Sequence, residues 1–160
     1  MHQSLAYIHS DANIARNVVI EPFVNIEKNV VIEEGTWIGS NVTIMEGARI
    51  GKNCKIFPGA VISAIPQDLK FEGEKSITII GNNCTIRECA TINRGTKASR
   101  ETIVQDNCLI MAYAHIAHDC KISNNCIIAN NVALAGHVNI GEFAIIGGLS
   151  AVHQFTNIGK

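Results

Sequence analysis

Residues 14–62 read IARNVV IEPFVN IEKNVV IEEGTW IGSNVT IMEGAR IGKNCK IFPGAV I, with an isoleucine opening every group of six. The same step begins at Ile8, resumes after a gap at Ile80, and after a second gap runs from Val104 to Ile158. A period of six fits neither an α-helix, with 3.6 residues per turn, nor a plain alternating strand. The spacing therefore indicates a repeat architecture that extends over nearly the whole chain.

The other positions of each hexad indicate what the repeat builds. Four residues after each aliphatic residue the side chain is small, as in Val18, Val24, Val30, Thr36, Val42, Ala48, Cys54, Ala60, Cys84, Ala90, Cys108, Ala114, Cys120, Cys126 and Val132. Three residues after it, asparagine or glycine recurs, as in Asn17, Asn29, Gly35, Asn41, Gly47, Asn53, Gly59, Asn83, Asn107, Asn125 and Asn131. Asparagine and glycine tolerate positive φ, so each hexad is predicted to be a short strand followed by a corner. The predicted fold is all-β: a parallel β-helix with three hexads, about 18 residues, in each triangular coil.

Five of the six cysteines occupy the small position of the repeat. They are Cys54, Cys84, Cys108, Cys120 and Cys126. This placement predicts buried, reduced thiols that pack as small apolar side chains, in preference to disulfides or zinc ligands. Only Cys89 is out of register.

Two segments interrupt the repeat without changing its phase. Residues 63–79 (SAIPQDLKFEGEKSITI) and 93–103 (NRGTKASRETI) contain charge, proline and glycine, and are predicted to be loops that leave the column. Counting hexads places both loops at the corner that follows Ile62, Ile92, Ile116, Leu134 and Val152. The loops therefore lie two coils and one coil below His118, within one β-helix domain that covers residues 1–160.

Polar side chains gather at that same corner in three successive coils. The residues after Ile116 are Ala117, His118 and Asp119; those after Leu134 are Ala135, Gly136 and His137; those after Val152 are His153, Gln154 and Phe155. His115 lies just before the group. A single histidine at a solvent-exposed corner has no need of a function, but four that converge beside two loops indicate an active site.

The residue types in this group suit acyl transfer to an alcohol. His118 would take a proton near neutral pH, Asp119 would hold the imidazole in one tautomer, and the N–H of Gly136 would face a developing oxyanion. The group contains no serine or cysteine nucleophile, so direct transfer is favoured over a covalent enzyme intermediate. Asp119 and Gly136 have structural alternatives as corner residues. Three histidines would also suit a zinc ion, although Asp119, Gly136 and Gln154 would then have no clear role.

Composition excludes several other classes of protein. The formal net charge is −1, with 13 basic and 14 acidic residues, which provides no general attraction for nucleic acid or for a membrane surface. The sequence contains no 18-residue apolar stretch and no signal-peptide pattern at its N-terminus. A cytoplasmic protein without membrane insertion is expected.

The motifs AHIAHDC, ANNVALAGHV, FAIIGG, AVHQF, QDLKFEGE and IRECATINRGT resemble those of the UDP-N-acetylglucosamine O-acyltransferases, the first enzymes of lipid A synthesis. The resemblance covers essentially the whole chain and implies a left-handed β-helix, a homotrimer with sites between adjacent columns, and no cofactor. It also implies transfer of a 3-hydroxyacyl chain from acyl carrier protein to the glucosamine 3-hydroxyl of UDP-N-acetylglucosamine. In this family His118 would be the general base, Asp119 its partner and Gly136 the oxyanion donor. Gln67, Asp68, Lys70, His115, His137, His153 and Gln154 would bind the sugar nucleotide.

One departure from the family concerns the end of the chain. Members of the family continue with further coils and a C-terminal helical domain, whereas this sequence stops in mid-repeat at Lys160. A truncated, inactive piece of the enzyme is therefore one expectation. A zinc enzyme of the γ-carbonic anhydrase type and a non-catalytic scaffold remain as alternatives.

Overall fold

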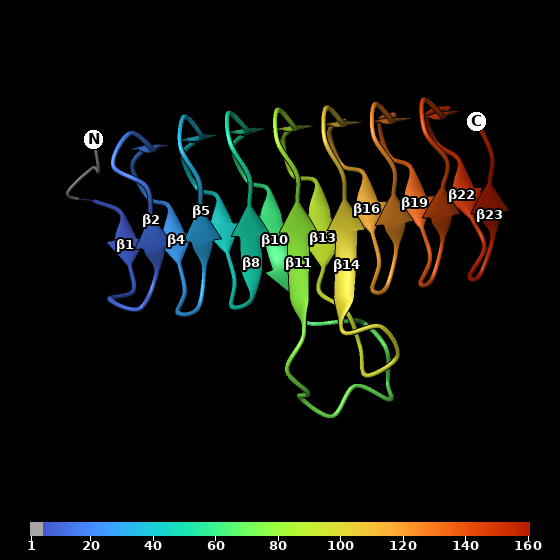
Figure 1. Cartoon of the computed structure of the whole chain (residues 1–160), viewed down its shortest axis with the longest axis horizontal. Helices are drawn as coiled ribbons and strands as arrows, with labels where there is room; N and C mark the ends of the chain where they lie inside the picture. Colours follow the sequence, from blue (N-terminus) through green and yellow to red (C-terminus); the bar gives the residue numbers. More distant parts are fainter. Residues whose placement is uncertain (1–4) are drawn as a thin grey trace.

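Each hexad folds as a short strand followed by a turn, and every third strand pairs in parallel with its counterpart in the next coil. The structure, a computed structural model that describes residues 5–160, is a left-handed parallel β-helix with three sheets. Figure 1 shows the column with its first and last coils at opposite ends and both loops on one side.

The three sheets collect the strands in turn. The first sheet contains β1 (Tyr7–Ile8), β4 (Asn25–Ile26), β7 (Thr43–Ile44), β10 (Val61–Ala64), β13 (Thr91–Asn93), β16 (His115–Ile116), β19 (Ala133–Leu134) and β22 (Ala151–Val152). The second contains β2 (Asn13–Ile14), β5 (Val31–Ile32), β8 (Ala48–Ile50), β11 (Ile77–Ile80), β14 (Glu101–Val104), β17 (Lys121–Ile122), β20 (Asn139–Ile140) and β23 (Asn157–Ile158). The third contains β3 (Val19–Ile20), β6 (Trp37–Ile38), β9 (Lys55–Ile56), β12 (Thr85–Ile86), β15 (Leu109–Ile110), β18 (Ile127–Ile128) and β21 (Ile145–Ile146).

The core is the interior of the column, and the hexad aliphatic residues fill it. Ile26, Ile62 and Ile116 are all 0% exposed, and the register pairs each such residue with its equivalent one coil away. Burial of one such side chain stabilises the fold by about 1.5–3 kcal/mol, and the repeat supplies one in every hexad. The small position also points inward, which confirms the expected pattern of two buried side chains per hexad.

The buried cysteines are free thiols, as predicted. Cys54, Cys84, Cys108, Cys120 and Cys126 are buried, whereas Cys89 is exposed. Each buried thiol donates a hydrogen bond to a backbone carbonyl in the next coil, for example Cys84 Sγ to Gln105 O at 3.0 Å. Burial raises the pKa of Cys120 to about 11, which keeps this thiol protonated.

The corners adopt the left-handed backbone conformation that the repeat predicts. Asn29, Asn53 and Gly35 have φ of 53°, 55° and 74°. Asn17 is an exception to the prediction because it is not among the residues with positive φ; its Oδ1 instead accepts a hydrogen bond from Gly35 N at 3.2 Å. Asp119 also occupies a left-handed corner, with φ of 59°.

Both loops leave the corner after the first sheet, but they are shorter than predicted. Strand β10 continues to Ala64 and β11 begins at Ile77, while β13 ends at Asn93 and β14 begins at Glu101. The ends of the predicted loops are therefore strand, because β11 and β14 pair with each other over four residues, from Ile77↔Glu101 to Ile80↔Val104. This pairing holds the loops 65–76 and 94–100 side by side at the base from which they project (Figure 1). Within residues 5–160 no helix is long and apolar enough to cross a membrane.

Candidate active site

The predicted stack of polar residues forms along one edge of the column. Asp119, His137 and Phe155 occupy successive corners, with φ of 59°, 61° and 64°. The N–H of His137 donates to His118 O at 3.0 Å, and that of Phe155 donates to Gly136 O at 3.2 Å. The His137 ring stacks on Phe155, with centroids 4.6 Å apart, and meets the His118 ring edge to face at 5.2 Å. Residues far apart in the sequence therefore touch because they are one coil apart in space.

His118 and Asp119 form the hydrogen-bonded pair at the centre of this edge. His118 Nδ1 lies 2.7 Å from Asp119 Oδ2, and both residues are buried. The two side chains come from adjacent positions of one turn after β16, where the left-handed corner at Asp119 brings the carboxylate back toward the imidazole. An ionised Asp119 accepts the Nδ1 proton, so Nε2 of a neutral His118 is the nitrogen free to accept a proton.

The loop of residues 94–100 keeps Asp119 ionised. Thr96 Oγ1 donates to Asp119 Oδ2 at 2.7 Å, the N–H groups of Thr96 and Ser99 donate at 3.1 Å and 3.2 Å, and the Ser99 hydroxyl donates to Oδ1. Burial alone would raise the pKa of this carboxyl, but the hydrogen bonds from Ser99, Thr96 and His118 lower its pKa to about 2. The carboxylate is therefore fixed in charge and position beneath the imidazole.

Gly136 lies one coil above His118 and has no room for a side chain. A Cβ atom at Gly136 would lie 2.5 Å from His118 Cε1 and 2.6 Å from Nε2. Within residues 5–160 the N–H of Gly136 donates no hydrogen bond, whereas the N–H of Glu46, at the same hexad position on the same edge, is bonded to Glu27 Oε2 at 3.0 Å. The glycine thus leaves space for the imidazole and leaves a backbone donor beside it.

A cavity of about 490 Å³ lies against this edge and contains most of the predicted site. Its lining residues come from the 65–76 loop, from β13 and from three successive corners: Gln67, Asp68, Leu69, Lys70, Asn93, Ala117, His118, Ala135, Gly136 and Gln154. The structure therefore brings Gln67, Asp68 and Lys70, which the resemblance implies as ligands of the sugar nucleotide, together with His118, Gly136 and Gln154.

Three of the predicted histidines do not line this cavity. His115 lies on the outer face of β16, where its Nδ1 is 2.8 Å from Thr91 Oγ1; burial and the neighbouring His118 lower the pKa of His115. His137 is half-buried, and its Nε2 lies 3.7 Å from Asp119 Oδ2. His153 is exposed, with Nδ1 3.1 Å from the carbonyl of Gln154. His115 and His137 therefore lie beside the His118 and Asp119 pair, whereas His153 contacts Gln154.

His118, Asp119 and His137 also offer ligand atoms that all lie within 4.8 Å of one another, close enough to hold a metal ion. The Asp119 carboxylate already accepts hydrogen bonds from Thr96, Ser99 and His118. A zinc-bound carboxylate would have to give up part of this set, and the Thr96 and Ser99 donors would then face a cation. The donor set fits an oriented histidine better than a metal centre.

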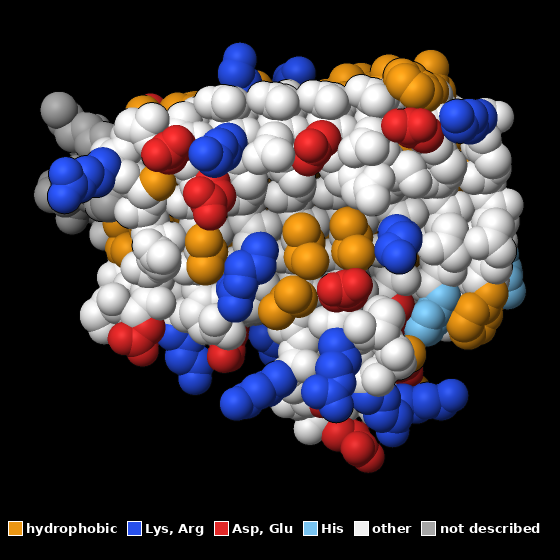
Figure 2. Space-filling model, viewed as in Figure 1, with side chains coloured by type: hydrophobic (Ala, Val, Ile, Leu, Met, Phe, Trp, Pro, Cys, Tyr) orange, Lys and Arg blue, Asp and Glu red, His pale blue; other side chains and the backbone are white. Residues whose placement is uncertain are grey.

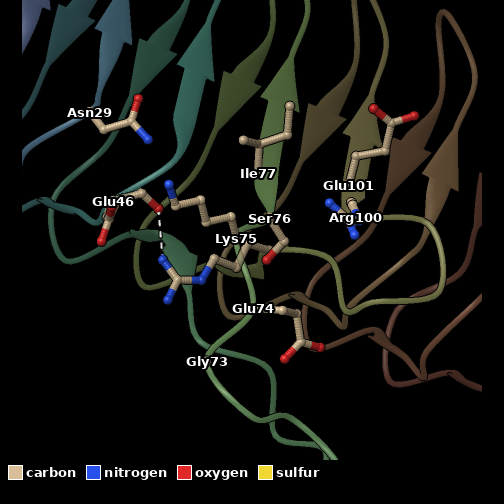
Figure 3. Close-up of a pocket in the computed structure, with 10 residues that line it drawn as sticks. Asn29, Glu46, Gly73, Glu74, Lys75, Ser76, Ile77, Arg100 and Glu101 are labelled. Carbon is tan, nitrogen blue, oxygen red and sulfur yellow. Dashed lines mark hydrogen bonds between the residues drawn. The ribbon is translucent and has the colours of Figure 1, made fainter.

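A second cavity of similar volume, about 490 Å³, lies between the two loops and the lower coils. Figure 3 shows Glu46, Glu74 and Glu101 around it together with Lys75 and Arg100. Acidic and basic side chains are mixed there, and His118 and Gly136 do not line it. The first cavity is therefore the candidate active site.

Sequence reasoning did not find the residues that hold Asp119. Thr96 and Ser99 lie in the second predicted loop, and Thr102 Oγ1 accepts a hydrogen bond from the Asp119 N–H at 2.8 Å. Nor did it single out Asn93, which lines the cavity. The sequence signal for these residues was that their loop leaves the column one coil below Asp119. The hexad spacing does not show the direction in which a loop folds.

Comparison with known proteins gives matches in sequence and in structure. Residues 29–64 and 101–136 match the family described as bacterial transferase hexapeptide (six repeats). An acyl-[acyl-carrier-protein]–UDP-N-acetylglucosamine O-acyltransferase from Campylobacter jejuni (strain RM1221) is 57% identical over 102 residues, which are 62% of this chain and 39% of that protein. Its counterpart from Helicobacter pylori (strain Shi470) is 46% identical over 96 residues, 59% of this chain and 36% of that protein.

Solved structures match almost the whole chain. The UDP-N-acetylglucosamine acyltransferase from Campylobacter jejuni has a TM-score of 0.95 at 42% identity and covers 100% of this chain and 63% of its own. That from Francisella novicida has a TM-score of 0.96 at 48% identity and covers 98% of this chain and 58% of its own. The chain spans less than two thirds of the length of each of these relatives. In sequence, fold and repeat together, the chain is similar to the UDP-N-acetylglucosamine O-acyltransferases among the hexapeptide-repeat proteins.

Proposed function

We propose that this chain carries the active site of an acyltransferase that moves a 3-hydroxyacyl chain from acyl carrier protein to the glucosamine 3-hydroxyl of UDP-N-acetylglucosamine. The observation that carries the proposal is the buried His118–Asp119 pair, with Nδ1 2.7 Å from Oδ2, at the wall of a cavity beside the Gly136 N–H, which donates no hydrogen bond to any of residues 5–160. Similarity to the UDP-N-acetylglucosamine O-acyltransferases supports the substrate class, and the geometry of the pair supports the reaction type.

The chemistry requires a base and an oxyanion donor, and the edge of the column offers both. His118 Nε2 takes the proton of the sugar hydroxyl as the oxygen attacks the thioester carbonyl. Gly136 N–H donates a hydrogen bond to the oxyanion that forms. The carbon–sulfur bond then breaks, and the thiol of the carrier leaves with the proton that His118 took up. Asp119 stabilises the imidazolium between these two steps.

Transfer is direct in this proposal, without an acyl-enzyme. The cavity lining contains neither serine nor cysteine. The hydroxyls of Thr96 and Ser99 donate to the Asp119 carboxylate rather than to His118. The pair therefore has no side-chain nucleophile to activate, and the substrate hydroxyl takes that role.

The sugar nucleotide would occupy the cavity and its mouth. Gln67, Asp68 and Gln154 offer hydrogen-bonding groups at the wall, and Lys70 offers a positive charge for a phosphate. His115, His137 and His153 would complete the site from around the pair. Figure 2 shows basic side chains gathered over the two loops; Lys70, Lys75, Lys97 and Arg100 are exposed there and form no ion pair within residues 5–160.

A homotrimer, with each site closed by a neighbouring column, is the proposed assembly. The site lies on a convex edge, and large apolar side chains are exposed on the C-terminal coils: Tyr113, Phe143, Ile145, Leu149 and Phe155, each at least 61% exposed. Apolar surface of this extent favours burial in an interface, which would also exclude water from the thioester. The proposed location is the cytoplasm, where acyl carrier protein and free thiols would both be found.

A zinc hydratase remains a second candidate because His118, Asp119 and His137 lie within metal-binding distance of one another. It predicts stoichiometric zinc and hydration activity. The acyltransferase predicts neither, and it also explains the hydrogen bonds that Thr96 and Ser99 donate to Asp119.

The test is acyl transfer from 3-hydroxyacyl carrier protein to UDP-N-acetylglucosamine by the wild type and His118→Ala. Removal of the general base should lower turnover by about 10²–10⁴-fold in a protein that still folds, with a loss of stability of about 1.5–3 kcal/mol from the missing hydrogen bond to Asp119. His9→Ala is the matched control, because His9 lies on the first coil and its Nδ1 accepts only a local hydrogen bond from Asp11 N. Turnover by His118→Ala equal to that of His9→Ala would refute the proposal.

A further inference from the structure

We infer that Asn93 is a substrate-binding residue whose side-chain amide forms hydrogen bonds with a polar group of the sugar nucleotide held against His118. The inference rests on the proposed function and adds to it a residue outside the predicted set. Three observations carry it: the burial of the amide, its lack of partners, and the bulge that positions it.

Asn93 is only 3% exposed, and its Oδ1 has no hydrogen-bond partner among the described residues, 5–160. Within residues 5–160 its Nδ2 also forms no hydrogen bond that would compensate. Buried side-chain amides are almost always paired, since an unpaired one costs the free energy of removing it from water. An amide that is left unpaired at the wall of a cavity is therefore placed to bind whatever fills the cavity.

The cavity beside Asn93 is the one that contains the proposed base. Asn93 and Ala117 lie on successive coils of the same edge, below Gly136, and all three line the cavity with His118. Asn93 ends β13, immediately before the loop that holds Asp119. The amide thus offers one acceptor and two donors next to the reacting groups, and a sugar presents matching hydroxyl and acetamide groups.

A β-bulge sets the position of Asn93. Strands β10 and β13 pair Ile62 with Ile92 but Ala64 with Asn93, so Ser63 is an extra residue in the ladder. Ser63 is fully buried with φ of 67°, and its hydroxyl donates to Glu46 O at 2.9 Å. A non-glycine residue with this backbone conformation is strained, and bulges of this kind occur beside active sites, where they re-aim a side chain. Beyond the bulge the two strands pair once more, Ala64 with Asn93, and this pair fixes the backbone of Asn93 at the cavity.

The test separates a substrate ligand from a structural residue, because the two roles predict opposite changes in stability. Asn93→Leu replaces the unpaired amide with an apolar side chain of similar shape, so the melting temperature should stay the same or rise. The Kd for UDP-N-acetylglucosamine, measured by titration calorimetry, should rise by about 10- to 100-fold, as the loss of one or two hydrogen bonds implies. The kcat/KM of acyl transfer should fall by at least the same factor.

Ser76→Ala is the matched control. Ser76 is 8% exposed and its Oγ also has no hydrogen-bond partner in the described part of the chain, but it lines the other cavity. This variant should also keep its melting temperature, and it should keep wild-type affinity and turnover.

The outcomes distinguish this inference from the proposed function. Asn93→Leu with wild-type affinity and wild-type kcat/KM would overturn the inference, and so would a loss of affinity matched by a fall in melting temperature. A wild-type protein that binds UDP-N-acetylglucosamine but transfers no acyl group would overturn the proposed function alone, with the titration still deciding the role of Asn93. A wild type that does not bind the nucleotide at all would overturn both.

Discussion

Replacing Gly136 with alanine would put a methyl group into space that the His118 imidazole occupies. The new Cβ would lie 2.5 Å from Cε1, 2.6 Å from Nε2 and 3.1 Å from Nδ1 of that ring. Carbon atoms in contact are about 3.5–4.0 Å apart, so the ring would have to move by about 1 Å. The substitution keeps the backbone N–H, and any loss of activity would therefore come from the ring and not from the proposed oxyanion donor.

The size of the effect follows from the hydrogen bond that orients the ring. His118 Nδ1 is 2.7 Å from Asp119 Oδ2, and a displacement of about 1 Å would lengthen this distance beyond hydrogen-bonding range. Asp119 would stay in place because Thr96 and Ser99 still donate to it. A base misplaced by about 1 Å costs on the order of 10²-fold in rate, so we expect kcat to fall by about 100-fold. The loss of one hydrogen bond to a carboxylate should cost about 1.5–3 kcal/mol of stability.

The assay is steady-state acyl transfer by Gly136→Ala and by a matched variant, Gly148→Ala. Gly148 has the same position in its hexad, two residues after Ile146, but the nearest atom to its added Cβ is Asn130 O at 3.3 Å and no imidazole is close. Gly148→Ala should have nearly wild-type kcat. Equal kcat values for the two variants would show that the space at Gly136 is not reserved for His118, and the reasoning would fail.

Two further predictions concern Asp119 and metal. The Asp119 carboxyl has its pKa lowered from 3.8 to about 2 in the folded state, so its contribution to stability, about 2 kcal/mol, is present above pH 4 and is lost as the pH falls through 2. Asp119→Asn should accordingly lower the free energy of unfolding at pH 7 by more than at pH 2, and denaturant titrations that give the same difference at both pH values would contradict this. For metal, dialysis against a chelator should leave acyl transfer unchanged, and elemental analysis should find less than one zinc per chain; chelation that abolishes activity would favour the zinc alternative at His118, Asp119 and His137.

The fold could be predicted because its physical cause is periodic. One buried isoleucine in each hexad sets the strand, and a residue that tolerates positive φ sets the corner, so the coil follows from spacing alone. Corner geometry continues even where residue type gives no signal: Tyr113, Phe143 and Leu149 have φ of 61°, 62° and 60°. Packing against the neighbouring coils imposes this backbone conformation on residues that rarely adopt it by themselves. At these corners tertiary structure overrides the conformational preference of the single residue. The type of each residue alone therefore does not predict its positive φ.

The site could be predicted only as far as the repeat reaches. Stacking by one coil placed His118, Gly136 and Gln154 on one edge, and the cavity they line confirms that placement. Thr96 and Ser99 could not be found in this way, because they lie in a loop where the period of six is absent. The bulge at Ser63 was hidden for a related reason, since an extra residue at the edge of a loop looks in the sequence like the first residue of that loop.

The position of the two interruptions connects the fold to the site. A loop inserted into a column of this kind leaves the coils above and below it in register, as the pairing of β10 with β13 and of β13 with β16 shows. An insertion can therefore be long without disturbing the core. The corner and the coil at which it leaves the column determine which residues it can contact. Here both insertions leave the column at the edge on which His118 lies. The loop one coil below supplies the donors that hold Asp119, and the loop two coils below supplies Gln67, Asp68 and Lys70 to the cavity wall. The regular column thus fixes the base, while the loops add the groups that a straight repeat would not provide.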